Sequence, residues 1–105
     1  MDAALKALAE PRRREIIRLV WMRELPATDI ADHFADVSRP AISQHLAVLK
    51  AAGLVTERRD GTRRLYRADR NEMKKVRKFL EEFWTSGLER LRDVAEAAQR
   101  DKEKR

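Results

Sequence analysis

The chain lacks cysteine and has few of the residues that shape loops and large aromatic cores. Its 105 residues include three Gly, three Pro and 6% aromatic residues. The absence of cysteine excludes disulfide frameworks, thiolate metal sites and cysteine nucleophiles. The scarcity of Gly and Pro leaves only few and short loops, and the length favours a single domain.

Long apolar runs are also absent. No segment approaches the ~20 apolar residues that a membrane-spanning helix needs, so the composition excludes a transmembrane protein. The first residues, Met1 to Leu5, lack the basic and long apolar segments of a signal peptide. We therefore expect a cytoplasmic protein with no membrane partner.

The charge is basic and unevenly distributed. Lys and Arg number 24 against 18 Asp and Glu, which gives a formal charge of +6. Residues 38–67 hold seven basic and two acidic residues, a net charge of +5. This local excess is the electrostatic footprint of a nucleic-acid-binding surface, although basic residues kept for solubility give the same composition. Composition alone leaves both explanations open.

Apolar residues recur at helical spacing from the start of the chain. Leu5 and Leu8 indicate a short first helix. Pro11 suits the first turn of a second helix, because its missing N–H would be unbonded there in any case. The pattern predicts that this second helix covers residues 11–23.

Leu25-Pro26 breaks the pattern before two further helices. The third is brief and capped by Ala27 or Thr28, and the fourth begins near Ser38 with Pro40 in its first turn. The residues that we expect these helices to bury are Ile30, Ala31 and Phe34 on the third, and Ile42, Leu46 and Leu49 on the fourth.

Gly53 is placed to end the fourth helix. In a Schellman stop, a glycine takes a left-handed conformation and the next residue, here Leu54, contacts the last turn at Leu49. Asp60-Gly61 follows, a dipeptide typical of two-residue hairpin turns in which both positions reach positive φ. We expect a β-hairpin over residues 54–67, with strands 54–59 and 62–67.

Asp69 and Glu72 have the spacing of a helix-capping pair. A last helix over residues 70–98 would be about 43 Å long, against the ~30 Å of a small domain. The first 68 residues cannot cover its whole apolar stripe, so we expect part of it to pack against a second copy across a two-fold axis. The alternative is a helix that frays after Gly87.

Residues 99–105 contain no apolar side chain, and we expect them to form a charged, frayed or disordered tail. The chain then consists of one domain over residues 1–98 and this tail. It contains no internal repeat and no interdomain linker.

The expected order of elements is helix, helix, helix, helix, strand, strand, helix. It describes a mostly α chain with a small β-hairpin, in the order of a winged helix-turn-helix. Because a helix fits the major groove of B-form DNA and a two-stranded ribbon can reach the backbone or the minor groove, this order suits double-stranded DNA.

The fourth helix would read the bases. Its apolar residues face the core and leave Arg39, Ser43, Gln44, Ala47 and Lys50 on its other faces. Gln44 can pair with adenine and Arg39 with guanine, each pair contributing about 1–3 kcal/mol of discrimination. Outside this arrangement, Gln44 would be read as an ordinary solvated helix residue.

Four arginines surround the expected hairpin turn, and they repel one another without a folding benefit. Contact with phosphate or with the minor groove explains them better than a solvated loop does. We expect Leu65 and Tyr66 to pack the hairpin onto the domain. Arg12, at the start of the second helix, either reaches a phosphate or pairs with a carboxylate such as Glu15 or Asp2.

Two sets of candidate residues follow. The candidates for DNA binding are Arg12, Ser38, Arg39, Pro40, Ser43, Gln44, His45, Lys50, Arg58, Arg59, Arg63 and Arg64. The candidates for a dimer interface are Leu5, Leu8, Phe83, Trp84, Leu88, Leu91 and Ala95.

Three segments carry a family resemblance: residues 5–14 (LKALAEPRRR), 38–55 (SRPAISQHLAVLKAAGLV) and 59–67 (RDGTRRLYR). Together they resemble the ArsR-type (ArsR/SmtB) winged helix-turn-helix transcriptional repressors of bacteria, over roughly residues 3–98. The resemblance implies a homodimer held by the first and last helices and an inverted-repeat operator near a promoter. It also implies that helix 38–52 is the reader and hairpin 54–67 the wing.

The chain departs from the metal-sensing members of that family. Many of them use a cysteine pair, or Asp, His and Glu ligands on the last helix, whereas this chain has no cysteine and no histidine there. His33 and His45 lie on different helices, without an evident carboxylate partner for a three- or four-ligand site, so we expect no metal site and no cofactor. We expect His45 to contact the DNA backbone and His33 to lie on the surface. The sequence names no effector.

Two other classes of function compete with a DNA-binding repressor. A winged-helix module for protein–protein interaction would not need four arginines on its wing. An enzyme would need a nucleophile with its base, a carboxylate pair in a cleft, or a Gly-rich phosphate loop, and the sequence contains none of these. We therefore expect no catalysis.

Overall fold

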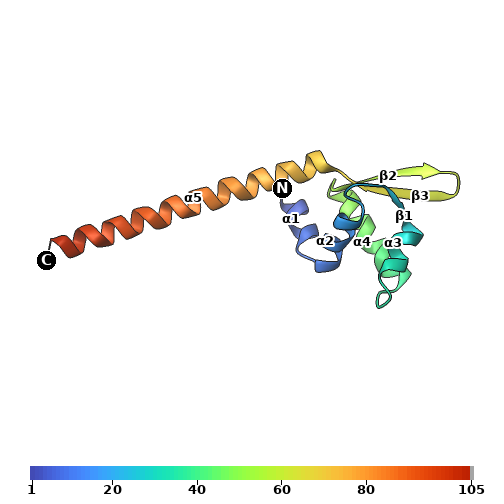
Figure 1. Cartoon of the computed structure of the whole chain (residues 1–105), viewed down its shortest axis with the longest axis horizontal. Helices are drawn as coiled ribbons and strands as arrows, with labels where there is room; N and C mark the ends of the chain where they lie inside the picture. The colour runs from blue at the N-terminus through green and yellow to red at the C-terminus, as the bar shows by residue number, and fades with distance from the viewer. Residues whose placement is uncertain (105) are drawn as a thin grey trace.

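The computed structural model describes residues 1–104, which form five helices and a small antiparallel sheet (Figure 1). The helices are α1 (Asp2–Leu8), α2 (Pro11–Leu19), α3 (Ala27–His33), α4 (Arg39–Ala51) and α5 (Arg70–Glu103). The strands are β1 (Leu25–Pro26), β2 (Val55–Asp60) and β3 (Arg63–Ala68). The fold is the winged helix-turn-helix expected from the sequence, with one additional short strand.

The core lies among α1 to α4 and the base of the hairpin. The side chains buried there are mostly branched aliphatic, and the largest fully buried ones are Ile16, Val20, Ile30, Ile42, Leu46, Leu49 and Leu54. The expected inward face of α4 is thus confirmed. Ile30 on α3 and Phe34, the residue after α3, are buried as expected, whereas Ala31 is half-buried. Burying this face leaves the polar face of α4 on the surface.

Local sequence signals set both ends of α4. The hydroxyl of Ser38 accepts a hydrogen bond from the N–H of Ala41 at 3.2 Å, and Pro40 lies in the first turn. At the other end Gly53 has a φ of 78°, the left-handed region. The N–H of Leu54 donates to the carbonyl of Leu49 at 3.0 Å, and that of Gly53 donates to Lys50 at 3.0 Å. This pair of bonds is the predicted Schellman stop.

The sheet has a third strand that the sequence analysis missed. The strand order is β1-β3-β2, and Leu25 pairs with Tyr66 while Pro26 pairs with Leu65. Proline is tolerated there because β1 is an edge strand. The expected cap at Ala27 or Thr28 is wrong: extended Pro26 precedes α3, and no side chain caps it.

The second helix is shorter than predicted. It ends at Leu19 rather than at residue 23. The carbonyl of Val20 accepts a hydrogen bond from the N–H of Ala68 at 2.9 Å, so pairing with a distant strand draws the chain out of the helix.

The hairpin turn is displaced by one residue from its predicted place. Asp60 pairs with Arg63, so Gly61 and Thr62 form the two-residue loop, and the strands cover 55–60 and 63–68. Gly61 has a φ of 63°, and residues 1–104 contain no non-glycine residue at positive φ. Glycine at the first loop position with an ordinary residue after it is the pattern of a type II′ turn.

The last helix extends far from the domain. Its start is capped as predicted, because Asp69 accepts a hydrogen bond from the N–H of Glu72 at 3.1 Å. Of its residues, Val76 is buried, and beyond it the helix runs free of the core (Figure 1). The molecule measures 74 × 28 × 21 Å as a result.

The expected end of this helix is wrong. It passes Gly87 without interruption and continues to Glu103, so residues 99–103 are helical rather than a frayed tail, while Arg105 lies outside the described residues. Gln, Arg, Lys and Glu have good helix propensity, and Arg100 and Lys102 in the last turn complement the helix dipole.

Candidate nucleic-acid interface

The exposed side of α4 forms a polar strip, which we call the reading face. It consists of Arg39, Pro40, Ser43, Gln44, Ala47 and Lys50, all of them exposed. Ser38 is exposed as well, but its hydroxyl is already engaged in capping the helix. The reading face therefore combines two cations and an amide with small side chains, which let a partner approach the helix closely.

The wing is the β2–β3 hairpin, which projects from the end of the molecule opposite to the free end of α5 (Figure 1). Leu65 and Tyr66 are 5% and 6% exposed, which confirms that they pack the hairpin onto the domain. Arg58, Arg59, Arg63 and Arg64 are exposed around its turn. Lys50 at the end of α4 contacts Glu57 of β2 at 3.1 Å, which joins the reading face to the wing.

Most of the candidate cations have carboxylate partners. Arg39 pairs with Asp32 at 3.0 Å, Arg63 with Asp60 at 3.1 Å, Arg64 with Glu57 at 3.9 Å, and Arg58 with Glu24. Arg59 has no such partner within residues 1–104. Exposed ion pairs such as those of Arg39 and Arg63 contribute at most about 1 kcal/mol each, so phosphates can displace their carboxylates at little cost.

Arg12 has a partner that the sequence analysis did not consider. Its Nη2 lies 2.9 Å from Oδ2 of Asp36, in the loop before α4, and its Nη1 donates to the other oxygen at 3.2 Å. This hydrogen bond raises the pKa of Arg12 and lowers that of Asp36. The contact fastens α2 to the entrance of the reading helix, and neither Glu15 nor Asp2 pairs with Arg12.

The two histidines occupy different surroundings. Nδ1 of half-buried His45 lies 3.3 Å from Nη1 of Arg13. Because a guanidinium only donates, Nδ1 must accept and the hydrogen of the neutral ring sits on Nε2. His33 is exposed, as expected, with its Nε2 3.6 Å from Glu15. Residues 1–104 contain no cluster of three or more His, Cys, Asp or Glu side chains suited to a metal ion.

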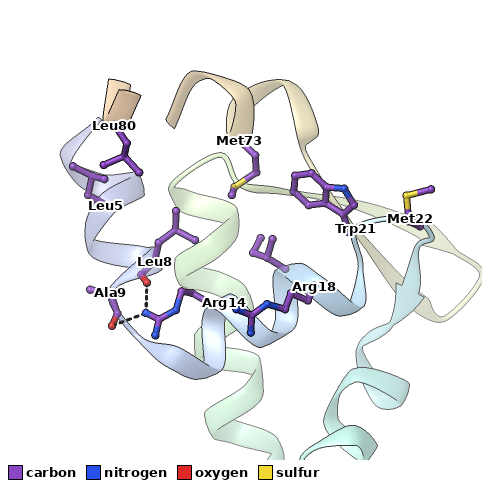
Figure 2. Close-up of a pocket in the computed structure, with 10 residues that line it drawn as sticks. Leu5, Leu8, Ala9, Arg14, Arg18, Trp21, Met22, Met73 and Leu80 are labelled. Atoms are coloured by element: carbon purple, nitrogen blue, oxygen red, sulfur yellow. Dashed lines mark hydrogen bonds between the residues drawn. The ribbon is translucent and has the colours of Figure 1, made fainter. Parts of the chain in front are cut away.

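An apolar groove lies between α1, α2 and the first turns of α5. Its main cavity measures about 740 Å³, and Figure 2 shows Leu5, Leu8, Met73, Trp21 and Leu80 around it. A second cavity of about 540 Å³ continues along α5 to Phe83 and Trp84. The guanidinium of Arg14 closes one edge of the groove by donating to the carbonyls of Leu8 and Ala9 (Figure 2).

The remaining candidates for the dimer interface lie on α5 and are exposed. Phe83, Trp84, Leu88 and Leu91 are 71%, 67%, 48% and 65% exposed, and Ala95 is exposed as well. We call these five residues the α5 stripe. Together with the groove they form an extended apolar surface, much larger than the isolated apolar side chains of a soluble monomer.

Sequence reasoning missed two groups of residues. Trp21, Met22, Met73 and Leu80 line the groove although they were not among the interface candidates. Glu24, Asp32, Asp36 and Glu57 hold the candidate cations. No sequence signal marks these carboxylates, since Glu24 and Arg58, for example, are 34 residues apart.

None of the helices in residues 1–104 combines the length and the apolar character needed to cross a membrane.

Comparison with known proteins places this geometry in a family. The family described as "Bacterial regulatory protein, arsR family" matches residues 10–57, from the start of α2 into β2. The HTH-type transcriptional regulator Rv2034 of Mycobacterium tuberculosis is 44% identical over 87 residues, which are 83% of this chain and 80% of that protein. The transcriptional repressor SdpR of Bacillus subtilis is 41% identical over 61 residues, 58% of this chain and 67% of that protein.

A solved structure agrees with these relatives. The ArsR-like transcriptional regulator from Rhodococcus sp. RHA1 superposes with a TM-score of 0.75 at 31% identity and covers 89% of this chain and 87% of its own. Proteins of this kind regulate transcription and are not enzymes. The chain therefore belongs to the ArsR family of winged helix-turn-helix, DNA-binding transcription regulators.

Proposed function

We propose that the protein is a sequence-specific repressor that binds double-stranded DNA through the reading face and the wing. The observation that carries the proposal is the joining of these two surfaces: Lys50 at the end of α4 contacts Glu57 at the base of the wing. The helix enters the major groove and the wing arginines follow the backbone or the adjacent minor groove.

Within this arrangement the side chains divide into two roles. Gln44 and Arg39 contact base edges and give discrimination. Ser43, Lys50, Arg58, Arg59, Arg63 and Arg64 contact phosphates and orient the domain on the duplex. His45 offers its Nε2–H to a phosphate from the edge of the reading face, and Arg12 contributes through its bond to Asp36, which fixes the entrance to α4.

The protein acts as a homodimer in this proposal. The groove and the α5 stripe together offer the apolar area that an isolated chain leaves exposed to water. A second copy related by a two-fold axis covers the same surface on both chains, with Leu5 and Leu8 of α1 beside the α5 stripe. Two reading helices then face two half-sites of an inverted repeat.

Repression follows from occupancy of promoter DNA. The relative SdpR is named a transcriptional repressor, and its 41% identity over 61 residues supports the same direction of control. We name no effector.

Binding to the protein's own promoter DNA, compared with a scrambled duplex over a series of salt concentrations, tests the proposal. For a dimer that makes about six to eight phosphate contacts, the logarithm of affinity should fall with the logarithm of salt concentration at a slope of roughly −5 to −7. The promoter duplex should bind more tightly than the scrambled one at every salt concentration. Equal affinities would contradict sequence-specific binding, and absence of binding at low salt would favour a module for protein–protein interaction.

A further inference from the structure

One carboxylate lies between the reading helix and the wing. Oε2 of Glu57 accepts hydrogen bonds from Nζ of Lys50 at 3.1 Å and from the hydroxyl of Tyr66 at 3.2 Å, and Oε1 lies 3.9 Å from Nε of Arg64. Glu57 and Tyr66 are directly opposite each other on β2 and β3. We call this set of contacts the helix–wing link.

The link differs from the other ion pairs of this surface in its burial. The Glu57 side chain is 15% exposed, whereas the carboxylates that hold Arg12, Arg39 and Arg63 are 53% to 71% exposed. The hydrogen bond from Lys50 keeps the pKa of Glu57 below its ordinary value, and burial together with the Glu57 charge raises that of Tyr66. A partly buried pair is less screened by solvent than an exposed one, so it holds its side chains more firmly.

The link also borders the surface that would meet DNA. A cavity of about 250 Å³ lies between α4 and the hairpin, and its walls include Ser43 and Ala47 of the reading face together with Lys50, Glu57 and Arg64. A carboxylate here repels phosphate at the corner where helix and wing meet. Two of the cations that would attract a phosphate there are bound to it instead.

We propose that Glu57 is a specificity-determining positioning residue, which holds Lys50 and Arg64 in fixed places so that they contact phosphate when the reading helix is correctly docked. The inference rests on the proposed DNA-binding function. Phosphate contacts position a protein without reading sequence, so two mobile cations at this corner would strengthen binding to every duplex alike. Like-charge repulsion from Glu57 suppresses that indiscriminate binding.

Glu57→Gln tests the inference, because the amide oxygen still accepts hydrogen bonds while the charge is lost. If one freed cation per protomer gains a phosphate, the salt slope for a scrambled duplex should steepen by about 2 per dimer, at ~0.9 per contact. The ratio of affinities for the promoter duplex and the scrambled duplex should fall roughly tenfold, an effect comparable to losing discrimination at one base pair.

Asp60→Asn is the matched control. It removes one carboxylate from the same wing, where Asp60 pairs with Arg63 alone, and does not touch the link. It should strengthen binding to both duplexes equally and leave their ratio unchanged. If Glu57→Gln changes the ratio no more than Asp60→Asn does, the effect belongs to net charge and the inference is overturned.

Tyr66→Phe distinguishes the effect of holding Glu57 in place from the effect of its charge. It also tests the inference if the Glu57→Gln variant does not fold. It removes one donor to Glu57 and leaves every charge in place. The affinity ratio should fall while the salt slope stays the same, and an unchanged ratio would contradict a positioning role. If the wild-type protein does not prefer its promoter duplex, the proposed function itself fails. If the wild type prefers that duplex and all three variants keep the same preference, only the role of Glu57 is contradicted.

Discussion

At the residue scale, the surface proposed to meet DNA is already neutralised in part by the protein's own carboxylates. Arg39, Arg58, Arg63 and Lys50 each have a partner within the chain. These partners occupy the places that phosphates would take, and they keep the mutually repelling arginines of the wing ordered before DNA arrives. Much of the excess of charge in residues 38–67 is therefore engaged in ion pairs within the chain, while Arg59 has no carboxylate partner within residues 1–104.

Gln44 is the residue whose role is easiest to isolate. It is exposed on the reading face, and within residues 1–104 no side-chain hydrogen bond engages it. Gln44→Ala should relax base preference at particular operator positions and cost about 1–3 kcal/mol of discrimination there. Competition binding with single-base variants of the promoter duplex measures this, and Gln99→Ala on α5 is the matched control. A uniform loss at all sequences would mean that Gln44 does not read bases.

The wing arginines should behave in the opposite way. Arg63→Ala combined with Arg64→Ala should weaken binding to all duplexes and make the salt slope shallower by as much as about 3 to 4 per dimer. Lys74→Ala with Lys75→Ala removes the same charge from α5, outside the proposed interface, and should leave the slope nearly unchanged. Loss of preference with an unaltered slope would show that the roles of wing and reading helix are reversed.

The lowered pKa of Glu57 links stability to pH. A carboxyl group whose pKa is lower in the folded state stabilises the fold above its unfolded pKa, and this contribution disappears as the pH falls through the folded value. The free energy of unfolding of the wild type should therefore exceed that of Glu57→Gln at neutral pH. The difference should begin to shrink as the pH falls towards the unfolded value of about 4.3, and it should vanish below the lower pKa of the folded state. Urea unfolding at several pH values measures it, and a constant difference would refute the assignment.

At the element scale, the success of sequence reasoning depends on how local each signal is. The Schellman stop at Gly53 and the cap at Asp69 depend on residues within one helical turn, and both are confirmed. The third strand and the early end of α2 depend on bonds to β3, more than forty residues further along the chain at Ala68. Short-range sequence patterns cannot predict pairing with a strand so far along the chain.

The candidate site follows the same rule. The exposed residues of α4 could be predicted, because burial of one helical face determines the other. The carboxylates that hold its cations could not, because the loops before α3 and α4 must fold before Glu24 meets Arg58 or Asp36 meets Arg12. Glu57 is closer in sequence to Lys50, yet nothing in the pattern indicates that helix and strand meet there.

The α5 stripe is the part of α5 that we propose to form the dimer seam. Leu88→Glu should place a charge in the dimer seam and yield monomers. Operator affinity should fall about 100-fold or more, because two linked chains no longer bind the two half-sites together. Sedimentation and DNA titration measure the two effects. Ser86→Glu adds the same charge to the opposite face of α5 and should leave the dimer intact. Unchanged mass for Leu88→Glu would refute the assigned seam.

At the scale of the whole molecule, the elongated shape agrees with the proposed homodimer. A domain with a buried core carries a helix that extends the longest dimension to 74 Å, and the exposed apolar residues lie along that helix and at its root. None of the residues that line the groove belongs to α4, so a second copy can cover the apolar surface without using the side chains of the reading face. In the proposed dimer, each chain then provides one of the two reading helices.

Selection of bound sequences from a pool of random duplexes tests the central claim most directly. A two-fold dimer that reads bases with α4 should enrich an inverted repeat whose half-site centres are about 10–10.5 bp apart, or a multiple of that spacing, so that both helices meet the same side of the duplex. Enrichment of a single unrepeated site, or of no sequence at all, would contradict the account.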